Sequence, residues 1–142
     1  MLKRCLWIAV PLLGLLGGCA TPLNSAQKAE LEHYRAENML IEEKNPGLAA
    51  GLGLLPGVGS FYSRSYGFGV VNLLLWPVSI LWDPVSGYDG AEAINYQATR
   101  AHVRALRVAE MNKLDSRLAD EEIDLKRYTL EKRKVEDKYS SL

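Results

Sequence analysis

Cysteine is nearly absent from this chain of 142 residues, which contains only Cys5 and Cys19. Both lie in its apolar N-terminal stretch, so no pair remains for a disulfide framework, a zinc site or a thiol nucleophile in the rest of the chain. A small protein without disulfides must be held together by its core, by a partner or by the membrane.

Charge of one sign is missing as well, because 17 basic residues balance 17 acidic ones. Nucleic-acid binding through a basic surface is therefore excluded as the main function. Histidine is limited to His33 and His102, which stand alone on expected helices and read as packed or exposed side chains. No HExxH, GxSxG, phosphate-loop or paired-cysteine motif is present, so we expect no enzyme activity, no metal and no cofactor.

The first 18 residues have the three parts of an export signal. Lys3 and Arg4 form a positive start, residues 6–16 are apolar, and Gly17 and Gly18 are the small residues that a signal peptidase requires. The apolar run is shorter than the roughly 20 residues of a transmembrane helix. Removal of residues 1–18 would leave 15 basic and 17 acidic residues.

The sequence Leu16-Gly17-Gly18-Cys19 resembles the lipobox of bacterial lipoproteins. This resemblance implies cleavage between Gly18 and Cys19, diacylglycerol on the Cys19 thiol and acylation of the new amino terminus. Several acyl chains anchor a protein stably where one chain does not. The alternative is an ordinary secretory signal with a chance cysteine. Ala20 follows the cysteine where inner-membrane lipoproteins of enteric bacteria often carry aspartate, which favours the outer membrane and leaves the inner membrane possible.

The remaining pattern predicts an all-α protein with three zones: 19–46, 47–90 and 91–142. The first is a lipidated N-terminus with a polar helix from Ser25 to Lys44, stopped by Asn45-Pro46-Gly47. The second is a glycine-rich hydrophobic helical hairpin. The third is a long, charged, amphipathic helix from Gly90 to Tyr139.

The predicted hairpin has two apolar arms, Leu48–Tyr62 and Phe68–Trp82, around a polar turn that carries the only charge of residues 47–82, Arg64. Fifteen helical residues span roughly 22 Å, which is short for a bilayer core of about 30 Å. Three placements are open. The hairpin can span a thinned bilayer, dip into one leaflet, or form the buried core of a compact domain under the long helix.

The stretch from Leu55 to Asp83 resembles the TM2 hairpin family, which has a glycine-rich first arm ending in Phe-Tyr, a short turn, and a second arm with Trp and a closing Asp. The matching positions are Gly57, Gly59, Phe61, Tyr62, Gly69, Trp82 and Asp83. Pro56, Pro77 and the Ser-Arg-Ser turn depart from the pattern. The resemblance implies an architecture and no reaction.

Asp83 and Asp89 flank the short loop that follows the second arm. Either can cap a helix or bind a cation, and capping is the favoured interpretation. Asp83 before Pro84 suits the end of a helix. Asp89-Gly90 reads as a turn into the long helix.

Apolar residues in the last zone recur at steps of three and four, through Ile94, Ala98, Ala101, Ala105 and Val108, and after a phase slip through Leu114, Leu118, Leu125, Tyr128, Val135 and Tyr139. This spacing is typical of a coiled coil or of an antiparallel helix pair. The charge runs at 120–122 and 132–134 are interpreted as a solvent-exposed face, and a specific binding patch is the alternative.

Together these features predict a membrane-anchored lipoprotein of the bacterial envelope with a structural or protein-interaction role. Its expected partners are the membrane, and either another protein or a second copy of the chain through the C-terminal helix. The alternative function is a carrier or chaperone that binds an apolar ligand such as lipid in the hairpin region.

Overall fold

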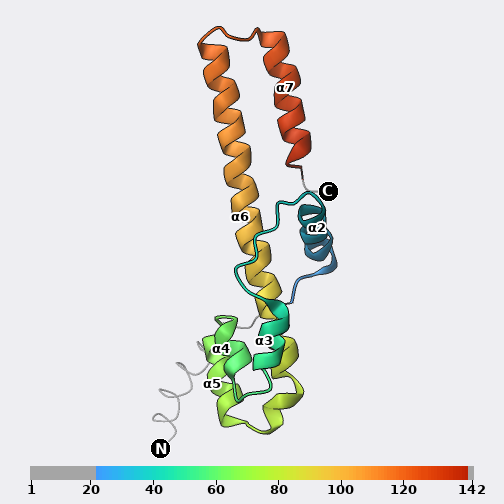
Figure 1. Ribbon diagram of the computed structural model, residues 1–142, viewed down its shortest axis with the longest axis vertical. Coiled ribbons are helices and arrows are strands. Elements are labelled where there is room, and N and C mark those ends of the chain that lie inside the picture. Colours follow the sequence, from blue (N-terminus) through green and yellow to red (C-terminus); the bar gives the residue numbers. More distant parts are fainter. Residues whose placement is uncertain (1–21, 141–142) are drawn as a thin grey trace, which may run out of the picture. The chain divides into compact units, whose positions relative to one another are not determined.

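The computed structural model describes residues 22–140 (Figure 1). The predicted signal sequence and the predicted lipidation site, Cys19, lie outside this range. The described chain is helical and contains no strand, as predicted. Its elements in order are α2 (Ser25–Ala36), α3 (Pro46–Leu52), α4 (Val58–Tyr62), α5 (Tyr66–Leu74), the 3-10 helix η2 (Val78–Leu81), α6 (Asp83–Ala119) and α7 (Leu125–Lys138).

These elements form two compact units. The described part of unit 1 comprises residues 22–24 and 42–95, and that of unit 2 comprises residues 25–41 and 96–140. Unit 2 therefore combines two stretches that are separate in the sequence. Helix α6 contributes its residues 83–95 to unit 1 and its residues 96–119 to unit 2.

Helix α2 begins at Ser25 as predicted but ends at Ala36, eight residues before Lys44. Asn38 adopts a positive φ of 56°, and the chain then runs without helix to Asn45. Side chains of α6 hold this segment. In unit 2 the Ile41 amide donates to Thr99 Oγ1 at 3.0 Å, and in unit 1 the Lys44 amide donates to Asn95 Oδ1 at 2.9 Å. These hydrogen bonds replace those that a longer helix would make.

The long helix begins earlier than predicted. Asp83 and Pro84 start α6 rather than end a preceding helix, because proline is well tolerated in a first turn, where its missing N–H has no helical partner. Asp89 and Gly90 lie inside α6, so the predicted turn at this pair is wrong.

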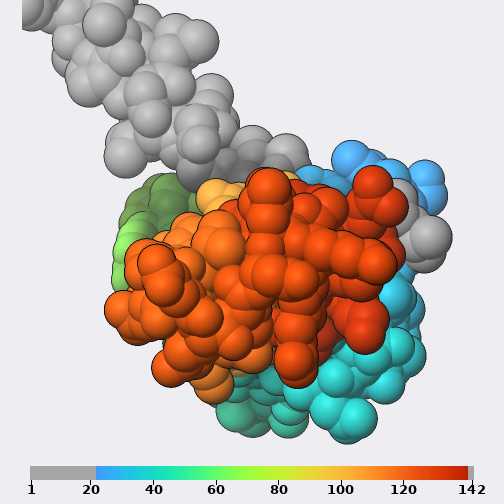
Figure 2. Space-filling view, turned by 90° about the horizontal axis from the view of Figure 1, so that it is seen from above, coloured from blue at the N-terminus to red at the C-terminus, as the bar shows by residue number. Residues whose placement is uncertain are grey.

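The prediction of one helix from Gly90 to Tyr139 is also wrong, because the chain turns between α6 and α7. Glu121 adopts a positive φ of 58° there. Asp124 then begins α7 by accepting a hydrogen bond from the Arg127 amide at 2.7 Å. The two helices run antiparallel side by side (Figure 1), and their ends beside the turn form one continuous surface (Figure 2). The periodicity therefore marks an antiparallel pair.

The seam of this pair is the hydrophobic core of unit 2. Its buried members are Tyr34, Val103, Leu114, Ile123, Val135 and Tyr139. Met39, Leu106, Met111, Leu118 and Tyr128 pack against them. Five of these residues lie on the downstream part of the predicted stripe: Leu114, Leu118, Tyr128, Val135 and Tyr139. Ala101, Ala105, Val108 and Leu125 are exposed, so the prediction that they lie in the seam is wrong.

We expect Asp124→Ala to weaken α7 by about 1 kcal/mol, because the substitution removes the N-cap acceptor. Amide hydrogen exchange in α7 should become roughly fivefold faster as a result. The matched control is Asp137→Ala near the other end of α7, where a negative charge opposes the helix dipole and its loss should not speed exchange. Equal acceleration in both variants would contradict the capping role.

Candidate functional site: a polar core under an apolar surface

Polar side chains fill the interior of unit 1. Ser60, Asn72, Ser79 and Asp83 are each at most 1% exposed and are among the largest fully buried side chains of the described chain. We call these four residues the polar core. They come from α4, α5, η2 and the first residue of α6, so the polar core joins the four segments.

Asn72 is the centre of the polar core. Its Nδ2 donates to Asp83 Oδ1 at 2.7 Å and to Ser60 Oγ at 2.9 Å. Its Oδ1 accepts from Trp82 Nε1 at 2.8 Å, and its backbone carbonyl accepts from Ser79 Oγ at 2.8 Å. One carboxamide thus satisfies donors and acceptors from three neighbouring segments, which fixes their mutual positions.

Asp83 is the one acidic residue of the polar core. Its Oδ1 also accepts from Ser60 Oγ at 2.5 Å, while its Oδ2 is buried without a hydrogen-bond partner in residues 22–140. The position at the start of α6 suits an acidic residue, because helix N-termini carry partial positive charge. Since Ser60 and Asp83 are 0% exposed, this pair presents no nucleophile to a substrate and acts as a structural connection.

The short helices of unit 1 lie close together (Figure 1), and glycine allows this approach. A Cβ at Gly53 would lie 2.5 Å from the backbone of Pro84, and one at Gly59 would lie 2.7 Å from Gly53 Cα. A Cβ at Gly87 would lie 2.8 Å from the Ala49 carbonyl oxygen. Real Cβ atoms do not approach this closely, so α3, α4 and α6 require glycine at these contacts.

The predicted motif positions all lie in unit 1. Gly57 has a φ of 71°, which favours glycine, and its Cα faces the Gly69 carbonyl of α5. The Phe61 ring covers Gly69, where a Cβ would lie 2.7 Å from the ring. Gly59 is buried in α4, and Trp82 and Asp83 join the polar core as described.

Tyr62 belongs to a charged end of unit 1. Its hydroxyl accepts from the Asn45 amide at 3.1 Å, and Lys44 Nζ lies 4.4 Å from its ring centroid. Arg64 in the adjacent turn pairs with Glu43 at 3.2 Å. We call Glu43, Lys44, Tyr62 and Arg64 the polar collar. It gathers charge at the end of unit 1 where α4 stops and α5 starts.

The surface of unit 1 is apolar over much of the rest. The exposed large hydrophobic side chains of this unit are Leu48, Leu54, Leu55, Tyr66, Val70, Val71, Leu73, Leu74, Leu75, Trp76, Val78, Ile80, Leu81, Trp82, Val85 and Tyr88. Leu74 and Leu81 are the most exposed, at 77% and 78%. These side chains form no buried core within unit 1, because its interior is occupied by glycine, alanine and the polar core.

Ser60, Asn72 and Ser79 were not singled out from the sequence. The available signal was their position as isolated polar residues within apolar runs, where a polar side chain requires an internal partner. The cation interpretation of Asp83 gains no support, since residues 22–140 contain no group of three potential metal ligands. His33 and His102 lie apart, in α2 and α6.

Charged pairs connect α6 and α7 in unit 2. Glu110 accepts from Lys138 Nζ and from the Tyr139 hydroxyl, both at 2.7 Å, and these hydrogen bonds lower its pKa. Glu131 accepts from Arg127 and Arg117, which likewise lower its pKa.

Helix α2 is tied to α6 through Glu30, which accepts from the Tyr96 hydroxyl at 2.6 Å. Burial first, and this hydrogen bond second, raise the pKa of Tyr96. The Arg100 guanidinium lies 3.5 Å from the other carboxylate oxygen of Glu30. Unit 2 is therefore joined by polar contacts at its surface and by apolar ones inside, the reverse of unit 1.

In residues 22–140, no helix is both long enough and apolar enough to cross a membrane. Comparison of the chain with known protein families, curated proteins and solved structures finds no match.

Proposed function

We propose that the protein is a lipoprotein of the bacterial envelope with a structural or protein-interaction role and no catalytic activity, held by lipid on Cys19 and by insertion of unit 1 into the membrane. The observation that carries this proposal is the inverted polarity of unit 1. Its largest fully buried side chains are polar, and its exposed surface is rich in Leu, Val and Trp.

Lipid is the environment that suits such a surface. In water each exposed leucine keeps its apolar surface hydrated and forgoes the favourable free energy of transfer into an apolar phase. A contiguous apolar surface also promotes aggregation of a soluble monomer. In hydrocarbon the same side chains are solvated, while polar groups must be satisfied internally. The hydrogen bonds of Asn72 provide this satisfaction.

The dimensions of unit 1 favour one leaflet. The segment of the predicted hairpin consists of short helices, and the nine residues of α5 extend only about 14 Å. Half of a bilayer core is roughly 15 Å. We place the apolar end around Leu74 and Leu81 deepest, and the polar collar with Tyr62 at the headgroups, where amphipathic rings are favoured.

The lipid anchor would act on the same unit. Cys19 precedes Pro22, the first described residue, by only three positions, and even an extended chain of this length covers about 11 Å. A tether this short keeps unit 1 at a high local concentration near the bilayer. Ala20 after the cysteine favours the outer membrane as its location.

Cys19→Ala is expected to abolish incorporation of labelled fatty acid and to leave the precursor uncleaved. Cys5→Ala is the matched control, because it removes the only other cysteine and should leave both labelling and cleavage intact. Gel analysis of labelled cells and fractionation of inner and outer membranes provide the readouts. Labelled protein in the Cys19→Ala strain would refute the proposed anchor.

A further inference from the structure

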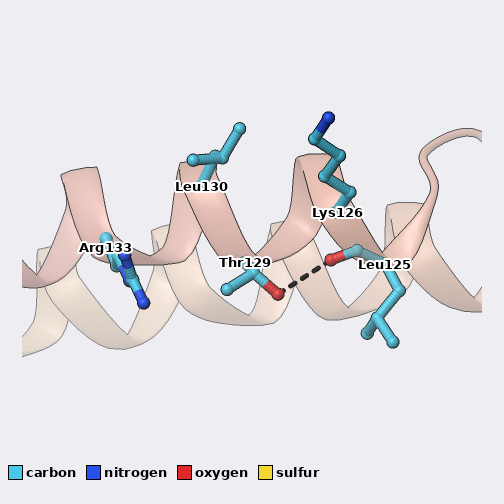
Figure 3. Close-up of a pocket in the computed structure, with 5 residues that line it drawn as sticks. All are labelled: Leu125, Lys126, Thr129, Leu130 and Arg133. Atoms are coloured by element: carbon cyan, nitrogen blue, oxygen red, sulfur yellow. Dashed lines mark hydrogen bonds between the residues drawn. The ribbon is translucent and has the colours of Figure 1, made fainter.

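The outer surface of α7 carries an exposed apolar groove. Leu125, Lys126, Thr129, Leu130 and Arg133 line a shallow hollow of about 550 Å³ (Figure 3). Leu125 is 68% exposed and Leu130 is 52% exposed. The buried residue of α7, Val135, lies on the side that packs against α6, so the groove is left without a partner within unit 2.

Thr129 adds to the apolar character of this groove. Its hydroxyl donates to the Leu125 carbonyl at 2.8 Å, as the dashed line in Figure 3 marks. The donor is thereby used within the helix, and the methyl group remains for contact between the two leucines. Lys126 and Arg133 stand at the edges of the groove, and no ion pair within residues 22–140 engages either of them.

Complementary charge lies on the same chain, in the turn before α7. Residues 120–124 contain four acidic residues and no basic one. Asp124 caps α7 and Glu122 lies 3.6 Å from Arg117. Asp120 and Glu121 are exposed and make no ion pair within the described chain. The surface of α7 thus has an apolar centre, with the free Arg133 beyond it and free acidic groups in the turn at the N-terminal end, where Lys126 also lies.

We propose that this groove binds the groove of a second copy of the chain, with the two α7 helices antiparallel. If Leu125 of one copy lies opposite Leu130 of the other, Arg133 comes opposite the acidic turn. The two-fold relation repeats this contact on both sides, because in an isologous interface each surface meets its own copy. Opposite ends of α7 attract each other in this register, whereas a parallel arrangement would place like charges together.

This inference deepens the interaction role in the proposed function and depends on it in one respect. Lipid anchors confine the copies to one membrane, which raises their effective concentration. An α7 contact too small to hold a dimer in dilute solution becomes populated under this confinement.

Chemical cross-linking in intact envelopes tests the contact directly. After removal of residues 1–18 and lipidation of Cys19, the chain carries no free thiol. A single introduced cysteine is then the only site at which a maleimide reacts. We expect Thr129→Cys to give a dimer with a short bis-maleimide. The control Lys134→Cys, exposed on the same helix outside the groove, should give at least about fivefold less dimer. Equal cross-linking at both positions would overturn the proposed surface.

Charge exchange tests the register. In the Thr129→Cys background, Arg133→Glu should lower the dimer at least about fivefold, because an acidic group would then face the acidic turn. Co-expression with a Thr129→Cys chain carrying Asp120→Lys and Glu121→Lys should restore cross-linking between the two chains. Failure to restore it would overturn the antiparallel arrangement. Labelled fatty acid measured on the same samples separates this outcome from failure of the lipid anchor.

Discussion

Replacing Asn72 by aspartate is expected to unfold unit 1. The substitution removes the two donors that Asn72 Nδ2 directs to Asp83 Oδ1 and Ser60 Oγ, and it places a second carboxylate 2.7 Å from the first in a fully buried site. Loss of a hydrogen bond to a buried charge and burial of an unpaired charge each cost several kcal/mol. We expect a loss of more than about 4 kcal/mol in the free energy of unfolding, a large part of the stability of a small domain.

Urea unfolding in detergent micelles, followed by tryptophan fluorescence, measures this effect. The sequence after residue 18 contains only Trp76 and Trp82, both in unit 1, so the signal reports on this unit alone. The decisive control is the exchange Asn72→Asp with Asp83→Asn, which restores one carboxamide beside one carboxylate. It should recover much of the lost stability. Additive losses in the double variant would show that the two side chains do not interact.

Introducing charge at Leu74 and Leu81 is expected to abolish insertion into lipid without unfolding the protein. Both side chains are more than three-quarters exposed, so Leu74→Glu with Leu81→Glu removes little internal packing. In hydrocarbon each charge costs roughly 3 kcal/mol. Binding to phospholipid vesicles should therefore fall at least about a hundredfold.

Vesicle flotation of an unlipidated chain that begins at Ala20 isolates the contribution of unit 1 from that of the acyl chains. Brominated phospholipids should quench Trp76 and Trp82 in the parent chain and not in the double variant. Val108→Glu with Ala119→Glu adds the same charge at exposed positions of unit 2 and should leave flotation unchanged. If the Leu74 and Leu81 variant floats as well as its parent, the proposed insertion is wrong.

The sequence predicted the helical class, the start of α2 and the downstream part of the stripe that pairs α6 with α7, because these depend on local periodicity. The upstream part of that stripe is wrong, since Ala101, Ala105 and Val108 are exposed. The sequence did not predict the end of α2 at Ala36. That end depends on Thr99, whose side chain binds the Ile41 amide from 58 residues away. It also missed the turn at 120–124, which contains neither glycine nor proline and depends on a positive φ at Glu121.

For the candidate site, the sequence identified the glycines and the Trp82-Asp83 pair but not the role of Asn72. A single polar residue in an apolar run indicates that its side chain requires a hydrogen-bond partner, but the pattern does not identify that partner. Ser60 and Asp83 lie 12 and 11 positions away and reach Asn72 only through the fold.

For the proposed insertion of unit 1 into a membrane, the hydrogen bonds of Asn72 impose an order on the steps. An open unit 1 would carry its carboxamide, the Asp83 carboxylate and the Trp82 indole N–H into hydrocarbon without partners. The closed unit presents leucine and valine instead. Assembly of the polar core must therefore come before or together with entry into lipid, so unit 1 is expected to arrive at the bilayer as a folded wedge rather than as separate helices that associate afterwards.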